Sequence, residues 1–137
     1  MGEVDTSFYV AVLRGISAPA SVTNLRVCNT WQDREGGTAA HNPWNTTQWE
    51  TGATQYNTFG NGTMHVWNYP NAATGIHATI STLTNGHYPR ILREFSSGIS
   101  GLGVCQAIDA SPWGTHGVAA LYATISPGCA PAPIPEG

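Results

Sequence analysis

Charged side chains are scarce in this sequence. Asp, Glu, Lys and Arg make up 9% of its 137 residues, against about 25% in typical soluble domains. The formal net charge is -3 and the basic residues form no cluster. The chain therefore lacks the positive surface with which proteins bind nucleic acids or anionic membranes, and we expect neither among its partners.

Long apolar runs are also missing. No stretch approaches the roughly 18 consecutive apolar residues of a transmembrane helix. Residues 1–7 have neither the basic start nor the apolar segment of a signal peptide. The sequence therefore predicts a protein that is made and held in the cytosol.

Cysteine and histidine are present without the spacing of a metal or redox site. The three cysteines, Cys28, Cys105 and Cys129, form no CxxC pair, and an odd number cannot all be bridged within the chain. We expect Cys28 and Cys105 to be reduced core residues, because free cysteine packs as a small hydrophobe. The five histidines show no HExxH or similar pairing, so neither a metal ion nor another cofactor is expected.

The pattern of apolar residues and breakers predicts one mainly helical domain of the α+β class. Residues 1–126 form the domain, and the Pro-rich residues 127–137 read as an extended linker or tail. Asn61-Gly62 is the expected turn of a small β-hairpin with strands at 55–59 and 64–67. Helices are expected at 8–14, 22–35, 72–84, 88–97, 104–108 and 118–125.

The helix that ends at Glu35 is the most informative segment. Ser21 is its expected N-cap and Gly36 follows its end. Its buried face is predicted from helical spacing to carry Val22, Leu25, Cys28, Trp31 and Glu35. Asp33 points about 200° away from Trp31. Burial against Trp31 would raise the pKa of Glu35 towards the range of a general acid, whereas the alternative is a surface acid paired with a neighbouring arginine.

A glycoside-cleaving site also needs a second group that stabilises the sugar cation or holds a nucleophile. Glu50 is the preferred candidate, and Asp33 is another. A third option has no second acid, and the hydroxyl groups of Thr46, Thr47 or Tyr56 then position water or a substrate amide. Rings with polar edges suit stacking against sugars, and Trp44 and Tyr69 are expected to line a groove. The full set of expected substrate-binding residues is Trp44, Asn45, Thr46, Thr47, Tyr56 and Tyr69.

The order of these motifs resembles the lysozyme-like superfamily of peptidoglycan-cleaving domains, in particular phage and bacterial modules akin to glucosaminidases and lytic transglycosylases. The resemblance extends from about Phe8 to Thr115. It depends on Trp31 with residues 35–37 (Glu-Gly-Gly), 42–47 (Asn-Pro-Trp-Asn-Thr-Thr), 56–57 (Tyr-Asn), 66–70 (Val-Trp-Asn-Tyr-Pro), 75–76 (Gly-Ile), 86–91 (Gly-His-Tyr-Pro-Arg-Ile) and 111–115 (Ser-Pro-Trp-Gly-Thr).

The resemblance implies a helical fold with a hairpin lobe, and a glycan groove between lobes with Tyr69 in its lining. Glu35 would protonate the leaving glycosidic oxygen of bacterial peptidoglycan. It also implies a module of a phage endolysin or tail-associated lysin, kept in the host cytoplasm until release or carried by the virion, with further modules after the linker. Two alternatives are an endolysin peptidase that uses Cys28 or histidines, and a non-catalytic wall-binding or virion structural domain.

Overall fold

The computed structural model describes residues 4–59, 62 and 64–125, and this part of the chain forms six helices and one antiparallel pair of strands. The mainly helical α+β prediction is confirmed. The helices are α1 (Thr6–Gly15), α2 (Val22–Glu35), α3 (Ala72–Leu83), α4 (Pro89–Ser97), α5 (Gly101–Asp109) and α6 (Val118–Ile125), and the strands are β1 (Thr54–Phe59) and β2 (Met64–Asn68). None of the described helices has the length and apolar content that crossing a bilayer requires. The predicted tail at 127–137 and Cys129 lie outside the described residues.

Side-chain caps fix where three of the helices begin. Ser21 Oγ accepts the Asn24 N–H at 3.1 Å, Asn71 Oδ1 accepts the Thr74 N–H at 2.8 Å, and Ser100 Oγ accepts the Gly103 N–H at 2.9 Å. Each bond satisfies a backbone donor that has no partner inside the helix. Helices α2, α3 and α5 therefore begin directly after a capping Ser or Asn residue.

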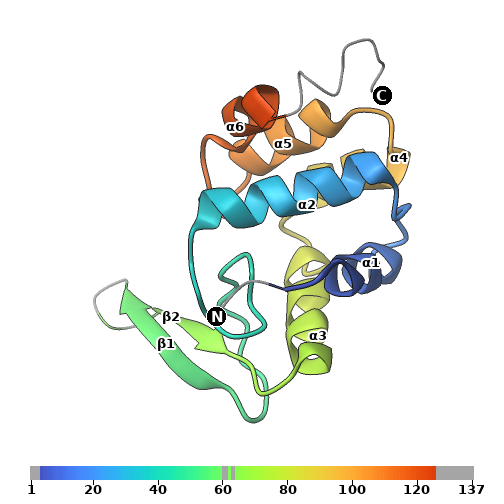
Figure 1. Cartoon of the computed structure of the whole chain (residues 1–137). Coiled ribbons are helices and arrows are strands. Elements are labelled where there is room, and N and C mark those ends of the chain that lie inside the picture. The colour runs from blue at the N-terminus through green and yellow to red at the C-terminus, as the bar shows by residue number, and fades with distance from the viewer. Residues whose placement is uncertain (1–3, 60–61, 63, 126–137) are drawn as a thin grey trace.

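Helix α2 lies across the middle of the molecule, between α5 and α6 on one side and α1 and α3 on the other (Figure 1). It packs against α1, α5 and α6, and buried residues from α1 to α6 form one core cluster. Cys28 and Cys105 lie in this cluster as free thiols, as expected. The core therefore surrounds the helix that delivers Glu35.

The buried face of α2 is shifted from the predicted one. Val22 is 69% exposed, so its assignment to the buried face is wrong, and Leu25 is only partly buried. Asn24 is buried instead, and its Nδ2 donates to Pro19 O at 2.9 Å and to Phe95 O at 3.0 Å. A polar residue can occupy this place because the segment between α1 and α2 and the last turn of α4 present backbone acceptors there. Trp31 stays at the centre of the buried face.

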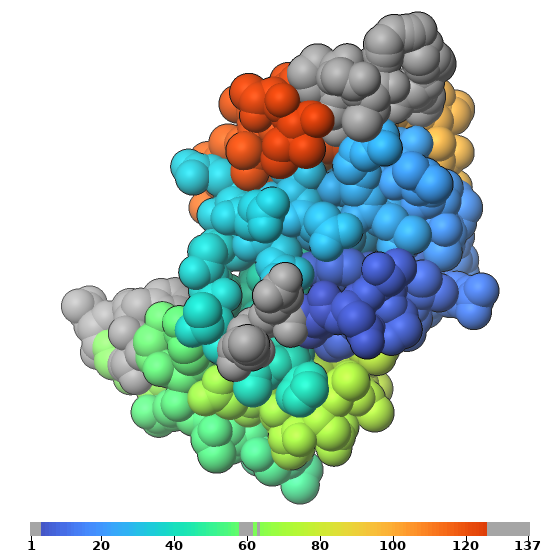
Figure 2. All heavy atoms as spheres, in the orientation of Figure 1, coloured from blue at the N-terminus to red at the C-terminus, as the bar shows by residue number. Residues whose placement is uncertain are grey.

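The hairpin projects from the helical body (Figure 2). Its strands pair Thr54 with Asn68 and Phe59 with Met64, and a bulge between Gln55 and Asn57 interrupts the register at Tyr56. Bulges re-aim a side chain, and here the Tyr56 hydroxyl lies 3.0 Å from Thr38 Oγ1 and accepts the Thr38 N–H at 3.2 Å. The bulge thereby ties the hairpin to the segment that follows Glu35. Asn61 of the expected turn lies outside the described residues.

A close approach at Gly75 gives a stability prediction. A Cβ at this position in α3 would lie 2.0 Å from His41 O, a backbone atom that cannot turn aside. Gly75→Ala should therefore lower the free energy of unfolding by about 1–3 kcal/mol, although alanine favours helices by about 1 kcal/mol over glycine. Urea unfolding monitored by circular dichroism measures the change.

The matched control is Gly103→Ala in α5. Its new Cβ would lie 2.7 Å from Glu94 Oε1, the far end of a flexible side chain, and 3.4 Å from Ser100 Cβ and Oγ, which is ordinary van der Waals contact. This variant should be neutral or slightly more stable than the wild type. Equal destabilisation of the two variants would contradict the steric account of Gly75.

Candidate active site

The Glu35 carboxylate is held at the end of α2 by three donors from three parts of the chain. Trp31 Nε1 donates to Oε2 at 3.3 Å, and the Thr115 hydroxyl donates to the same oxygen. Asn45 Nδ2 donates to Oε1 at 3.0 Å. The structure thus brings the predicted acid together with one predicted substrate-binding residue, Asn45.

Two glycines allow this arrangement. Gly36 ends α2 in the left-handed conformation with φ 69°, which glycine adopts without strain. A Cβ on Gly37 would lie 2.4 Å from Asn45 Oδ1, so only glycine leaves room for the Asn45 side chain. Asn45 itself has φ 58°, a value that asparagine tolerates better than most residues. The backbone therefore adopts a left-handed conformation both directly after Glu35, at Gly36, and at its hydrogen-bond donor Asn45.

Aromatic rings pack next to the Glu35 carboxylate, on the side of the helical core. Trp31 stacks on Trp44 with centroids 4.0 Å apart, and Trp44 stacks on Tyr9 at 5.6 Å. The edge of Trp113 meets Trp31 at 4.9 Å, and its Nε1 donates to Trp44 O at 2.9 Å. These rings keep water from one side of Glu35 and fix the two loops that reach it.

This environment raises the pKa of Glu35. Burial is the largest influence, because it disfavours the charged form. The hydrogen bonds from Thr115, Asn45 and Trp31 act in the opposite direction and stabilise the carboxylate. The negative end of the helix dipole also favours the neutral acid. Glu35 therefore has the environment of a group that can hold and release a proton.

A hollow of about 270 Å³ adjoins this carboxylate through Asn45. Its lining comes from the hairpin, the loops and the ends of α3 and α4, and consists of Asn45, Thr46, Thr47, Met64, Thr82, Tyr88, Pro112 and Trp113. Glu35 is not itself a lining residue of the hollow, and the hydrogen bond from Asn45 links it to the lining. Three of the predicted substrate-binding residues, Asn45, Thr46 and Thr47, share this surface.

Two predicted groove residues are core residues instead. Trp44 is 1% exposed, and Tyr69 is 2% exposed with its hydroxyl donating to Gln48 O. Burial, and secondarily the charge of Glu50, raises the pKa of the Tyr69 phenol. The prediction that these rings line a groove is wrong, because loop aromatics lack the periodicity that separates buried from exposed positions. Tyr56 is exposed on the hairpin but bonds to Thr38.

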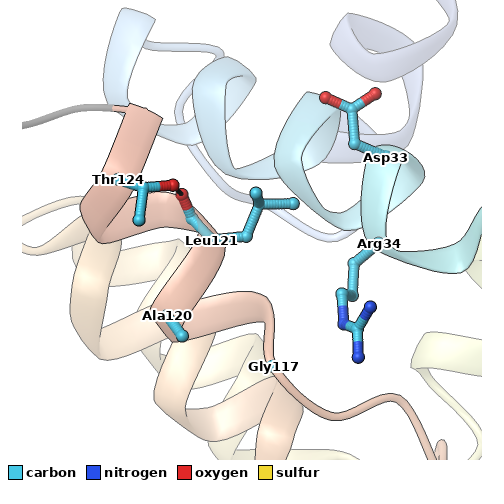
Figure 3. A pocket seen from close by; sticks show the side chains of 6 residues that line it. All are labelled: Asp33, Arg34, Gly117, Ala120, Leu121 and Thr124. Carbon is cyan, nitrogen blue, oxygen red and sulfur yellow. Dashed lines mark hydrogen bonds between the residues drawn. The ribbon is translucent and has the colours of Figure 1, made fainter.

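The two alternative acids face other surroundings. Glu50 Oε2 lies 2.9 Å from His77 Nδ1 on α3, and among the described residues it shares no hydrogen-bond partner with Glu35. Asp33 is exposed beside Arg34 at a second hollow of about 610 Å³ formed by α2 and α6 (Figure 3). In that view the Asp33 carboxylate points away from the Arg34 guanidinium. The structure does not join either acid to Glu35.

Sequence reasoning missed the hydroxyl of Thr115 as a partner of Glu35. The two residues are 80 positions apart, and no local pattern links them. Met64, Thr82 and Tyr88 were likewise not identified as lining residues. The segment 111–115 (Ser-Pro-Trp-Gly-Thr) is one of the motifs of the resemblance, and its Gly114 adopts a left-handed φ of 92°, but the motif does not point to Glu35.

The other reactive side chains do not form a second centre in the described residues. Cys28 is fully buried, and burial raises the pKa of its thiol, as expected of an inert core cysteine. Between residues 4 and 125, apart from the undescribed positions in the hairpin turn, no three His, Cys, Asp or Glu side chains are grouped to hold a metal ion.

Comparisons with protein-family models, with curated proteins and with solved structures found no match.

Replacing Glu35 with Gln should change how stability depends on pH. Because the pKa of Glu35 is raised in the folded protein, its stabilising contribution is present below the unfolded pKa and is lost as pH rises through the folded pKa. As pH rises from below the unfolded pKa to above the folded pKa, the free energy of unfolding of the wild type should fall relative to that of Glu35→Gln by about 1.4 kcal/mol per unit of pKa shift. Urea unfolding at a series of pH values from about 3 to 8 measures this difference.

Asp33→Asn is the control for this experiment, since it removes an exposed carboxylate from the same helix. The same pH trend in both variants would show that burial of Glu35 is not its cause.

Proposed function

We propose that this domain cleaves the glycan strand of bacterial peptidoglycan, with Glu35 as the general acid. One observation carries the proposal: a partly buried carboxylate with a raised pKa lies at a helix end, beside a hollow that Asn45, Thr46 and Thr47 line together with apolar and aromatic side chains. A general acid needs a pKa near the working pH and a position within reach of the leaving oxygen. The motif resemblance to lysozyme-like domains supports the choice of substrate.

The hydrogen bonds around Glu35 favour one oxygen as the proton donor. Oε2 accepts the Trp31 indole N–H, which can only donate, and it also accepts the Thr115 hydroxyl. Oε1 has the single described donor Asn45, which lines the hollow. The proton is therefore carried on Oε1, on the substrate side. A glycosidic oxygen that displaced the Asn45 contact would receive it there.

Neutral groups supply the rest of the proposed site. Thr46 Oγ1 lies 2.5 Å from Thr82 Oγ1, so these hydroxyls already satisfy one another. Thr47 is exposed at the same hollow, and among the described residues its hydroxyl has no hydrogen-bond partner, so it can orient water or a substrate amide. Protonation by Glu35 serves both hydrolysis and intramolecular transglycosylation, because the two reactions differ only in the oxygen that attacks the sugar.

Glu35→Gln should lower the cleavage of purified peptidoglycan by at least about 100-fold, because it removes the proton donor but keeps the side-chain shape. Mass spectrometry of the soluble products provides the assay. Reducing ends indicate hydrolysis, anhydro ends indicate transglycosylation, and free peptide amines indicate a peptidase. Full activity of Glu35→Gln, or release of peptide amines alone, would refute the proposal, and wall binding without any product would favour a binding domain.

Glu50→Gln should retain most of the activity, since the contacts of Glu50 favour a structural role. The side chain of Glu50 is only 17% exposed, and it is paired with His77, whose side chain is 70% exposed; because solvent reaches the His77 end of the pair, it should contribute no more than about 1 kcal/mol. The same product assay compares the variant with Glu35→Gln. Loss of activity equal to that of Glu35→Gln, in a variant that unfolds like the wild type, would make Glu50 the second catalytic group.

A further inference from the structure

The loop that carries Thr115 is flanked by two glycines that both require the left-handed conformation. Gly114 has φ 92° and Gly117 has φ 86°. Glycine leaves the backbone more alternatives than any other residue. The place of the Thr115 hydroxyl therefore depends on the contacts that fix the loop from outside.

Several contacts fix the two ends of this loop. At its start, the Trp113 N–H donates to Ser111 Oγ at 3.2 Å, in addition to the indole contact with Trp44. At its end, the Asp109 carboxylate accepts the N–H groups of Val118 at 2.8 Å and Ala119 at 3.1 Å. These contacts hold α5, the loop and α6 together but do not connect the centre of the loop to α2.

Arg34 makes that connection. Its Nε donates to His116 O at 2.6 Å. A Cβ on Gly117 would lie 2.7 Å from the same Nε, so the loop passes directly against the guanidinium. Figure 3 shows the Arg34 side chain extended from α2 towards Gly117.

Two neighbouring pairs thus join the end of α2 to the loop: Arg34 with His116, and Glu35 with Thr115. We propose that Arg34 is a positioning residue, which holds the loop so that the Thr115 hydroxyl stays on the Glu35 carboxylate. This inference deepens the proposed function, because it assigns control of the acid to a residue outside the hollow. It predicts that Arg34 acts on Glu35 through Thr115 and not through its own charge.

The ionisable groups around this loop are few. Asp33 and Arg34 are the exposed neighbours of Glu35 on α2. His116 Nδ1 lies 3.1 Å from Asp109 O, and the Asp109 carboxylate is engaged by the start of α6. A titration of Glu35 must therefore follow His116 and Asp109 at the same time.

The test is a double-mutant cycle with the pKa of Glu35 as its readout, measured by carbon NMR of the side-chain carboxyl. Thr115→Val removes a hydrogen bond that lowers this pKa, so the pKa should shift upward. Arg34→Gln should shift it in the same direction by a smaller amount. In the Thr115→Val background, Arg34→Gln should cause no further shift, because the contact that it maintains is already gone.

The control is Arg14→Gln, which removes an exposed arginine near the end of α1 and should leave the pKa unchanged. Thermal unfolding and near-UV circular dichroism check that each variant keeps the wild-type fold. An equal shift from Arg34→Gln with and without Thr115 would identify a direct effect of charge and overturn the proposal. A pKa unaffected by Arg34→Gln, when Thr115→Val does shift it, would also overturn it.

This readout does not require activity, so it separates the inference from the proposed function. A wild type that cleaves no peptidoglycan would refute the glycosidase proposal and leave the coupling between Arg34 and Glu35 to be judged from the NMR cycle. If the wild type is active, the alkaline limb of its pH–rate profile should move upward in Thr115→Val and less in Arg34→Gln.

Discussion

The Glu35 carboxylate is partly removed from water, and the surrounding segments supply the hydrogen bonds that compensate for this. A buried charge without partners is costly, and three neutral donors reduce that cost here. They come from α2 itself, from the segment before the hairpin and from the loop before α6. Burial nevertheless remains the larger influence on the pKa. The neutral form of the acid is therefore favoured more than in a solvent-exposed glutamate.

The aromatic stack explains how the segment at 42–47 reaches its place. Trp44 inserts its ring between Trp31 and Tyr9, and its Nε1 donates to Cys28 O at 3.2 Å. With this ring fixed in the core, the next residue, Asn45, meets Glu35. Asn42 secures the same turn, since its amide binds Thr46 O and Trp67 O at 2.9 Å each. A core residue thus positions a site residue: the buried ring of Trp44 holds Asn45 beside Glu35.

Much of the fold could be predicted because its signals are local. Ser21 and Gly36 mark the ends of α2, and the four-residue step from Trp31 to Glu35 selects Glu35 over Asp33. The limits of that reasoning are equally physical. Val22 matched the helical spacing but is exposed, because Asn24 found backbone acceptors in other segments. Thr115 could not be found, since its contact with Glu35 exists only after α5 and α6 have packed on α2.

The low charge content of the sequence has a consequence at this site. Asparagine, threonine and tryptophan donors surround Glu35 where a more charged protein could place lysine or arginine. The charged neighbour in the sequence, Arg34, instead directs its Nε to a backbone carbonyl of the loop. Salt screens interactions between exposed charges far more than it affects burial or short hydrogen bonds. The proton affinity of Glu35 is thus set mainly by packing and loop position, so that loosening a loop is the most direct way to change it.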